Sequence, residues 1–297
     1  MRVVDLFCGC GGLSLGFQNA GFDIVSAYDN WSLALDVYRL NFNHKAEMLD
    51  LRNVEQSIET INVDKPEMII GGPPCQDFSS AGKRNEDNGR GDLTKSYAEI
   101  ISQIRPEMFV MENVERITKT KKLAEAVEIF KTVGYGLSQV VLDASKCGVP
   151  QKRKRFIMVG RLGEQDGFMD KYFSAGLSTK SMTIADYLGD SLGVEYYYRH
   201  PRSYARRGIF SVNEPSPTIR GVNRPIPPNY ELKHNDPVRS KDAIRPLTTI
   251  ERSYIQTFPT TFKFLGGKTD MEQLIGNAVP VNLGFYIASA IKQYRDK

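Results

Sequence analysis

Residues 3–13 read Val3-Val4-Asp5-Leu6-Phe7-Cys8-Gly9-Cys10-Gly11-Gly12-Leu13. The apolar run over residues 3–7 predicts a buried strand, and the glycines predict a tight turn into a helix over residues 13–20. Glycine at such a turn lets the backbone approach a ligand closely. A dinucleotide-binding turn of the G-x-G-x-x-G type would need glycine at position 14, where this chain has Ser14, so the turn argues against NAD and FAD.

Working outward from this turn, strand and helix patterns alternate over the first 160 residues. We expect further strands at residues 22–28, 68–70, 108–111, 140–142 and 156–159, and helices at residues 31–42, 97–104, 123–133 and 281–294. This alternation predicts an α/β fold with a largely parallel sheet and helices on both faces. Ligands bind at the carboxyl ends of the strands in such sheets, so residues that follow the predicted strands should share one edge.

Four groups of residues follow predicted strands. They are Gly9, Asp29, the segment from Gly71 to Cys75, and Glu112 with Asn113. A carboxylate in the place of Asp29, 20 residues after Gly9, can bind both hydroxyls of a ribose. Asp50 is a second carboxylate that could follow a strand and meet an adenine amino group.

The composition bounds the class of protein. The chain has 297 residues, 41% of them hydrophobic and 25% charged, which is ordinary for a globular protein with one or two cores. No apolar run approaches the roughly 18 residues of a membrane span, and Asp5 interrupts the apolar start. We therefore expect a cytoplasmic protein. The four cysteines form no C-x-x-C pair and the three histidines are scattered, so a zinc site is not expected.

The charge is uneven along the chain. Residues 151–245 hold 17 Lys and Arg but only 10 Asp and Glu, although the formal charge of the whole chain is +4. A basic segment beside a mildly acidic body suggests a polyanionic partner, while a solvated charged face explains the same numbers. After residue 162 prolines become frequent and the alternation is lost. We expect residues 1–162 and 272–297 to form one domain, residues 163–244 a smaller loop-rich domain, and residues 245–271 a hinge.

Three polar groups carry the candidate chemistry. Cys75 in Gly71-Gly72-Pro73-Pro74-Cys75-Gln76 follows a predicted strand and should lie at the ligand edge. A lone cysteine is more often an inert buried residue, but this position favours a reactive thiol that acts as a nucleophile. Glu112 ends an apolar strand, so it needs either a catalytic task or a structural ion pair with Arg153 or Arg155. Gln151, Arg153 and Arg155 alternate along one extended face, which could meet phosphate or the carboxylate at the edge.

These elements, in this order, resemble the cytosine-C5 DNA methyltransferases of bacterial restriction–modification systems. The resemblance covers residues 3–160 and 245–294. Beside the segments already quoted, it rests on Arg245-Pro246-Leu247-Thr248, Gln256-x-Phe258-Pro259 and Gly276-Asn277-Ala278-Val279-Pro280. It implies a Rossmann-like methyltransferase domain joined to a smaller target-recognition domain.

The resemblance also implies S-adenosyl-L-methionine as the cofactor. By position, Phe7 would contact its adenine, and Gly9, Cys10, Gly11 and Gly12 its methionine end. Asp29 would take the ribose hydroxyls and Asp50 the adenine amino group, with Asn30 or Trp31, Leu51 and Pro74 nearby. Asn277, Ala278 and Val279 would close the pocket from the C-terminal side.

For catalysis, the resemblance implies that Cys75 adds to C6 of a flipped cytosine and that Glu112 hydrogen-bonds N3 and the exocyclic amine. Arg153 or Arg155 would help to lower the pKa of the thiol. DNA contacts are expected from residues 77–93 and from the target-recognition domain. The candidates are Gln76, Ser79, Lys83, Arg84, Arg90, Arg206, Arg207, Arg220 and Arg224.

The partner implied in this way is double-stranded DNA, with a monomeric enzyme and a possible cognate restriction endonuclease. Two alternatives keep the same residues. One is the branch of the family that methylates a cytosine in transfer RNA, and the other is a catalytically inactive DNA-binding relative. A dinucleotide oxidoreductase is the third, and Ser14 with Pro74-Cys75 makes it remote.

Overall fold

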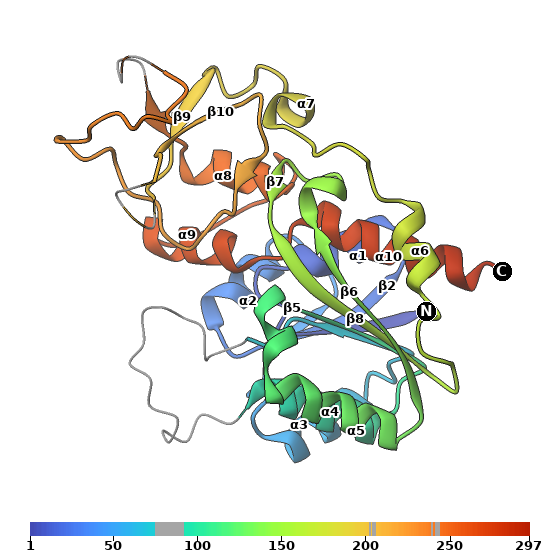
Figure 1. Ribbon diagram of the computed structural model, residues 1–297. Helices are drawn as coiled ribbons and strands as arrows, with labels where there is room; N and C mark the ends of the chain where they lie inside the picture. Colours follow the sequence, from blue (N-terminus) through green and yellow to red (C-terminus); the bar gives the residue numbers. More distant parts are fainter. Residues whose placement is uncertain (75–91, 202, 204–205, 239, 241–243) are drawn as a thin grey trace.

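The computed structural model describes residues 1–74, 92–201, 203, 206–238, 240 and 244–297 (Figure 1). Its main element is a seven-stranded sheet in the order β3-β2-β1-β4-β5-β8-β6. The strands are β1 (Arg2–Leu6), β2 (Asp23–Asp29), β3 (Lys45–Met48), β4 (Met68–Gly71), β5 (Met108–Val114), β6 (Tyr135–Asp143) and β8 (Lys154–Leu162). Strand β8 pairs antiparallel with β5 and β6, and the other pairs are parallel, which confirms the predicted α/β fold with a largely parallel sheet.

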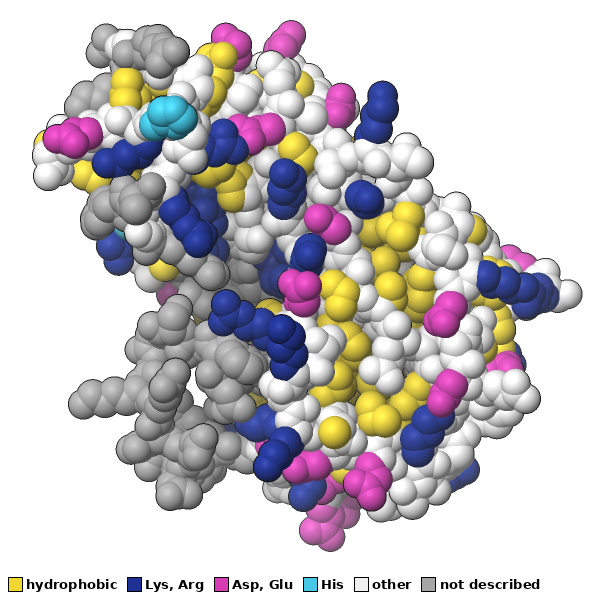
Figure 2. Space-filling view, viewed as in Figure 1, with side chains coloured by type: hydrophobic (Ala, Val, Ile, Leu, Met, Phe, Trp, Pro, Cys, Tyr) yellow, Lys and Arg dark blue, Asp and Glu magenta, His cyan; other side chains and the backbone are white. Residues whose placement is uncertain are grey.

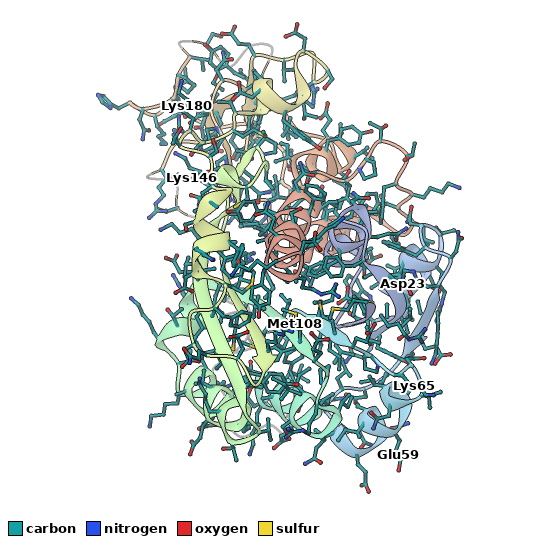
Figure 3. All side chains as sticks on the ribbon, turned by 90° about the vertical axis from the view of Figure 1, so that its right-hand side faces the viewer. Asp23, Glu59, Lys65, Met108, Lys146 and Lys180 are labelled. Carbon is teal, nitrogen blue, oxygen red and sulfur yellow. The ribbon has the colours of Figure 1, made fainter. Side chains whose placement is uncertain are left out.

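Helices cover both faces of this sheet. They are α1 (Gly12–Asn19), α2 (Ser32–Arg39), α3 (Val54–Asn62), α4 (Leu93–Ile104), α5 (Lys121–Thr132), α6 (Asp170–Ala175) and α10 (Val281–Arg295). Phe17 of α1 and Ile287 of α10 belong to the core of one face, and Tyr97 of α4 and Phe130 of α5 to the core of the other. Figure 1 shows α3, α4 and α5 below the sheet, with α1, α6 and α10 above it. In the perpendicular view, Met108 lies in the middle of the layers (Figure 3).

The register of the strands aligns their carboxyl ends. Leu6 lies opposite Gly71, and Gly71 lies opposite Met111, in three adjacent parallel strands. The residues that come next, Phe7, Gly72 and Glu112, are therefore at one edge. Strand β1 has β2 on one side and β4 on the other, so the chain order reverses here, and an open α/β sheet binds ligands at such a point.

A second unit lies above the sheet in Figure 1. It contains α7 (Ile184–Leu188), β9 (Tyr196–Tyr198), β10 (Ile209–Ser211), β11 (Ser216–Pro217), β12 (Arg245–Pro246), α8 (Thr249–Ile255) and α9 (Lys268–Asn277). Its core joins Ile184 and Phe210 to Ile255 and Ile275. The segment expected as a hinge, residues 245–271, thus contributes α8 and the start of α9 to this unit. Strand β11 pairs with β7 (Gln151–Lys152), which links this unit to the sheet.

Strand β3 and the helices α3 and α6 were not expected from the sequence. Strand β3 is mostly exposed, so it lacks an apolar pattern, and α3 buries only Ser57 and Ile61. The expected strand at residues 108–111 also continues to Val114. Glu112 and Asn113 are therefore the last buried residues of β5 and do not follow it.

The segment Lys268–Arg295 is long and apolar enough to cross a membrane, with a mean hydropathy of 1.5 over its most apolar window. However, 67% of that window is buried inside the molecule. The segment is also interrupted between Asn277, where α9 ends, and Val281, where α10 begins. The segment is therefore buried to the extent expected of helices in the core of a folded protein.

Helix α10 packs against α1 at Gly16 with no room for a side chain. A Cβ atom at Gly16 would lie 2.5 Å from the carbonyl oxygen of Val281 and 2.6 Å from the backbone nitrogen of Phe285. Both of these atoms are backbone, so neither can move away cheaply. Glycine at this position therefore sets how closely the last helix approaches the first.

We predict that Gly16→Ala lowers the free energy of unfolding by about 1–3 kcal/mol, because overpacking outweighs the gain of about 1 kcal/mol that alanine brings to a helix. Urea denaturation would measure this change. Gln18→Ala, at an exposed position of the same helix, is the matched control and should change stability by less than about 0.5 kcal/mol. An unchanged or raised stability in Gly16→Ala would contradict the packing described here.

Candidate active site

A cavity of about 450 Å³ lies at the carboxyl edge of the sheet, which is the size of a small-molecule site. Most of the residues expected to bind cofactor or to act in catalysis line it. These are Phe7, Gly9, Cys10, Gly12, Asp29, Asn30, Asp50, Leu51, Pro74, Glu112, Arg153, Arg155, Asn277, Ala278 and Val279. Trp31 lines it as well, so both Asn30 and Trp31 reach the cavity.

The turn after β1 is shaped by its glycines. Phe7 and Gly9 both have positive φ angles, 58° and 53°, which is uncommon for phenylalanine and ordinary for glycine. A Cβ atom at Gly12 would lie 2.1 Å from the carbonyl oxygen of Val279. Glycine at this position therefore lets the segment before α10 close one wall of the cavity. Gly11 does not line the cavity, because it faces the ring of Phe42 behind the turn.

Asp29 is held at the end of β2 by backbone donors. Its Oδ2 accepts from the backbone N–H of Gly9 at 2.8 Å, and its Oδ1 accepts from that of Trp31 at 2.9 Å. Burial raises the pKa of Asp29 above the usual range, and these hydrogen bonds oppose the shift. Each oxygen keeps a lone pair that can face the cavity.

Asp50 also lines the cavity, and it is hydrogen-bonded to the neighbouring Arg52. Both of its oxygens accept from the guanidinium of Arg52, which lowers the pKa of Asp50. The Asp50 side chain is 43% exposed. A ligand amino group at this position would therefore share the carboxylate with Arg52.

Glu112 and Arg155 form an ion pair on the cavity wall. Arg155 Nε lies 2.8 Å from Glu112 Oε1, and both side chains are nearly buried. The two residues come from neighbouring antiparallel strands, β5 and β8. The sequence left two explanations for a glutamate at this position, a structural ion pair and a place at the catalytic edge. The structure shows Glu112 both in an ion pair and in the cavity wall. Glu112 Oε2 would lie 3.1 Å from a Cβ atom at Gly72, so this oxygen faces the segment that leads to Cys75.

Arg153 is fully buried and joins distant segments. Its terminal nitrogens donate to the backbone carbonyls of Ile219, Gly276 and Ala278, at 3.0, 3.1 and 3.1 Å. Gln151, on the same side of the strand, accepts from the backbone N–H of Ile219 and donates to Gln256. We expected the face with Gln151, Arg153 and Arg155 to meet phosphate or a carboxylate. Arg155 does contact a carboxylate, that of Glu112, whereas Arg153 donates to backbone carbonyls.

The thiols of Cys8, Cys10 and Cys147 are buried. Burial raises the pKa of Cys10 and of Cys147 to about 12, and raises that of Cys8 as well. These three thiols are therefore protonated at neutral pH and poor nucleophiles. Cys75 lies outside the described residues, directly after Pro74 of the cavity wall.

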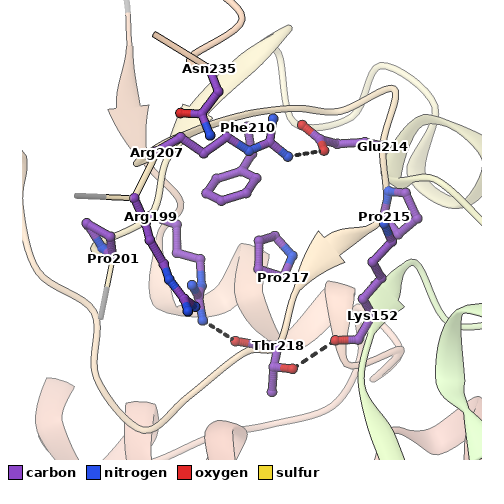
Figure 4. Close-up of a pocket in the computed structure, with 11 residues that line it drawn as sticks. Lys152, Arg199, Pro201, Arg207, Phe210, Glu214, Pro215, Pro217, Thr218 and Asn235 are labelled. Carbon is purple, nitrogen blue, oxygen red and sulfur yellow. Dashed lines mark hydrogen bonds and ion pairs between the residues drawn. The ribbon is translucent and has the colours of Figure 1, made fainter. Parts of the chain in front are cut away.

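The second unit contains a basic cavity of about 500 Å³ (Figure 4). Arg206 and Arg207 line it, together with Lys152 and Arg199. Figure 4 shows Arg207 over the ring of Phe210 and paired with Glu214. In the space-filling view, Lys and Arg side chains gather over this unit and down the centre of the face (Figure 2).

The remaining arginines predicted to contact DNA lie close to His200. Arg220 donates to the carbonyl of His200, and Arg224 is exposed. Burial lowers the pKa of His200, and the charges of Arg224, Arg220 and Arg199 lower it further. The positive charge is therefore dense on this side of the unit. Gln76, Ser79, Lys83, Arg84 and Arg90 fall outside the described residues.

Sequence reasoning missed one polar residue of the main cavity. Asp5 is buried within β1 and lines the cavity, although it was noted only as a break in an apolar run. A carboxylate inside a buried strand is costly enough to have drawn notice. Within the part of the chain that the structure describes, no group of three or more His, Cys, Asp or Glu side chains could hold a metal ion.

Comparison with known proteins identifies the family. The sequence profile of C-5 cytosine-specific DNA methylases matches residues 1–293. The chain belongs to this family. It is thus a DNA cytosine-5 methyltransferase, in agreement with the resemblance drawn from the motifs.

Two similar proteins are named as Type II methyltransferases. M.HindV of Haemophilus influenzae is 58% identical over 98% of this chain and 96% of its own length. M.HgiDI of Herpetosiphon aurantiacus is 53% identical over 99% of this chain and 95% of its own length.

Solved structures of more distant proteins share the fold of this methyltransferase. The S. pombe Dnmt2 methyltransferase superposes with a TM-score of 0.75 at 19% identity, and covers 99% of both chains. A putative DNA modification methyltransferase encoded within an E. coli prophage superposes with a TM-score of 0.70 at 20% identity, and covers 100% of both chains.

We predict that Arg153→Met lowers the free energy of unfolding of this methyltransferase by about 3 kcal/mol, because three backbone carbonyls lose a buried donor. Chemical denaturation would measure the loss. Lys152→Met, one residue away and exposed, should stay within about 0.5 kcal/mol of the parent. Equal effects of the two substitutions would contradict the structural role given to Arg153.

Proposed function

We propose that this enzyme transfers the methyl group of S-adenosyl-L-methionine to C5 of a cytosine flipped out of a specific double-stranded DNA sequence. The observation that carries this proposal is the cavity at the edge of the sheet. Its walls combine a glycine turn, Asp29 and the Glu112–Arg155 pair with Pro74, the residue before Cys75. The candidate nucleophile thus directly follows a residue of the cavity wall in the sequence.

The residues of the cavity fit the cofactor in kind. No atom lies within 4 Å of the place where a Cβ atom of Gly9 would be, so the turn leaves room for the methionine end. Asp29 takes the ribose hydroxyls. Phe7 packs on the adenine, and Asp50 meets its amino group. Asn277, Ala278 and Val279 close the site because Arg153 holds their backbone in place.

The chain's own residues then act on the cytosine. The thiolate of Cys75 adds to C6, which makes C5 nucleophilic enough to take a methyl group. The C5 proton leaves, the electron pair of its bond re-forms the C5–C6 double bond, and Cys75 departs as thiolate. When bound, S-adenosyl-L-methionine supplies the methyl group as an electrophile.

Glu112 is the residue that stabilises the base during this addition. It hydrogen-bonds N3 and the exocyclic amine, where charge develops as the Cys75–C6 bond forms. Arg155 holds its carboxylate at 2.8 Å and leaves Oε2 facing the segment before Cys75. Arg155 is therefore a positioning residue in this account, and Arg153 acts further out, through the backbone it binds.

DNA lies along the basic unit. Exposed Arg206 and Arg224 contact phosphates or base edges, while Arg207 and Arg220 already have partners within the protein. The segment with Gln76, Ser79, Lys83, Arg84 and Arg90 contacts the DNA near the flipped base. In this division, residues 163–244 recognise the target, residues 245–271 connect, and residues 1–162 with 272–297 hold the chemistry.

The names of the two relatives support a biological setting for this proposal. Both are Type II methyltransferases, so this enzyme protects DNA from a restriction endonuclease with the same site. It acts as a monomer in the bacterial cytoplasm, and the endonuclease needs no stable contact with it.

The proposed function is tested by incubating the purified protein with radiolabelled S-adenosyl-L-methionine and either unmethylated DNA or bulk transfer RNA, then resolving the nucleosides. We expect label in 5-methylcytosine from DNA alone, at positions that define one sequence. Label from transfer RNA alone would replace the proposed substrate, and no label from either would leave a DNA-binding relative without catalysis.

We predict that Cys75→Ser lowers turnover at least about a thousandfold, because an alcohol is a far weaker nucleophile than a thiolate. DNA affinity, measured by fluorescence anisotropy, should stay within about threefold of the parent, because no binding contact is lost. Cys147→Ala, at a buried thiol remote from the cavity, is the matched control and should keep its turnover. Full turnover in Cys75→Ser would eliminate this residue as the nucleophile.

We predict that Arg206→Ala weakens DNA binding to all sequences by a similar factor and lowers the slope of log affinity against log salt by about 1. Binding titrations at several salt concentrations measure both effects. Lys180→Ala removes one exposed charge from the same unit outside the basic cavity, and should leave the slope unchanged. Identical slopes for Arg206→Ala and the parent would exclude a phosphate contact.

A further inference from the structure

The ion pair between Arg207 and Glu214 has no task in the function described so far. Both side chains line the basic cavity of the second unit and reach solvent, with exposed fractions of 29% for Arg207 and 27% for Glu214. Arg207 Cζ lies 4.3 Å from the centroid of the Phe210 ring. Figure 4 shows the guanidinium above this ring and directed toward Glu214.

The backbone that follows Arg207 is fixed by a buried carboxylate. Asp236 Oδ1 accepts from the backbone N–H groups of Gly208 and Ile209, at 3.2 and 3.1 Å. Asp236 Oδ2 accepts from the hydroxyl of Tyr230 at 2.7 Å, so the carboxylate is itself held in place. Arg207 therefore enters β10 from a defined position, although the unit has few regular elements.

Glu214 is fixed as well. Its Oε1 accepts from the backbone N–H of Ser211 at 3.0 Å, and its Oε2 accepts from a terminal nitrogen of Arg207. The guanidinium has five N–H donors, and each carboxylate oxygen has two lone pairs, so both groups can bind a ligand while they stay paired. Stacking on Phe210 covers a face of the guanidinium and leaves its N–H edge available. The pair thus offers neighbouring donors followed by an acceptor.

The charges of the cavity say what kind of ligand fits. Among the described residues that line it, four are cationic and Glu214 is the only carboxylate. The cations attract a polyanion such as DNA, but a carboxylate in the same place repels phosphate. A ligand that meets this cavity favourably must therefore also offer a hydrogen-bond donor to Glu214. Phosphate oxygens offer none, whereas base pairs do.

The basic cavity begins one residue away from the main cavity along the chain. Thr218 Oγ1 donates to the carbonyl of Lys152 at 2.8 Å, and both residues line the basic cavity. The next residues, Arg153 and Ile219, are bonded to each other at 3.0 Å, and Arg153 lines the main cavity. A base pair held in the basic cavity would thus lie near the cytosine that is methylated.

The order of donors and acceptor distinguishes the base pairs. In the major groove a G·C pair presents two acceptors on guanine, N7 and O6, and then a donor on cytosine, N4. An A·T pair presents an acceptor, a donor and an acceptor, followed by a methyl group. Two donors of Arg207 followed by an oxygen of Glu214 match the first series and not the second.

We propose that Arg207 and Glu214 together recognise one G·C pair of the target sequence. Arg207 donates to N7 and O6 of the guanine, and Glu214 accepts from N4 of the paired cytosine. This inference rests on the proposed DNA substrate and names two residues that determine its sequence. Other base pairs at this position are then disfavoured about 5- to 150-fold.

The experiment is bisulfite sequencing of unmethylated plasmid DNA after limited turnover by the purified full chain with S-adenosyl-L-methionine. It gives the methylated fraction of every cytosine together with the sequence around it. For the parent we expect a site with at least one fixed G·C pair besides the target. Arg207→Lys, which loses the fork of donors, and Glu214→Gln, which loses the charge, should both relax one and the same position.

Glu214→Gln keeps an oxygen for the Ser211 N–H, and Arg207→Lys keeps the positive charge, so each variant retains part of the local structure. Urea denaturation checks that each is folded, and either folded variant alone decides the question.

Two control variants separate recognition from other effects. Glu251→Gln removes the same charge from another Arg–Glu pair of the second unit, that with Arg245, outside the basic cavity, and should keep the sequence preference of the parent. Arg206→Ala removes a cation from the cavity and should lower methylation at all sites by a similar factor.

An unchanged sequence preference in the folded variants, or a uniform loss like that of Arg206→Ala, would overturn the role of the pair. The same relaxation in Glu251→Gln would overturn it too. Absence of any methylation by the parent would instead overturn the proposed function.

Discussion

The buried guanidinium of Arg153 is the interaction on which the rest of the structure depends. It lies between two strands of the N-terminal part of the chain, and it donates to carbonyls at residues 219, 276 and 278. These carbonyls belong to the second unit and to the segment that closes the cavity. An unpaired guanidinium in this place would be very costly, so the three segments are held together wherever the protein is folded. The basic surface of the second unit is therefore held in a fixed position relative to the cavity.

Glycine makes that closure possible. The carbonyl of Val279 occupies the space that a side chain at Gly12 would need. The backbone of residues 220–221 occupies the space that a side chain at Gly276 would need. At both positions backbone packs directly against backbone, and the close packing leaves no space for a side chain. The cavity that results is lined by buried Asp5 and Glu112 and by partly buried Asp29, and Glu112 is paired there with Arg155.

Much of this could be predicted from the sequence, and the exceptions have physical causes. The apolar strand before Gly9 and the buried runs before Gly71 and Glu112 are strong patterns, so the sheet edge and its residues followed from them. Strand β3 was missed because it is an edge strand with exposed side chains, and α8 and α9 because prolines and glycines surround them. Arg153 and Arg155 are alike in sequence. Only the fold shows that Arg155 faces a carboxylate and Arg153 faces backbone carbonyls.

The central claim is that Cys75, which follows Pro74 of the cavity wall in the sequence, bonds to a cytosine in DNA. It is tested most directly with a DNA substrate that carries 5-fluorocytosine, because C5 then cannot lose a proton and the protein–DNA bond persists. The account predicts a covalent complex that requires the cofactor, with the nucleotide mapped by mass spectrometry to the peptide that contains Cys75. An adduct on another residue, or DNA methylation without any covalent complex, would contradict it.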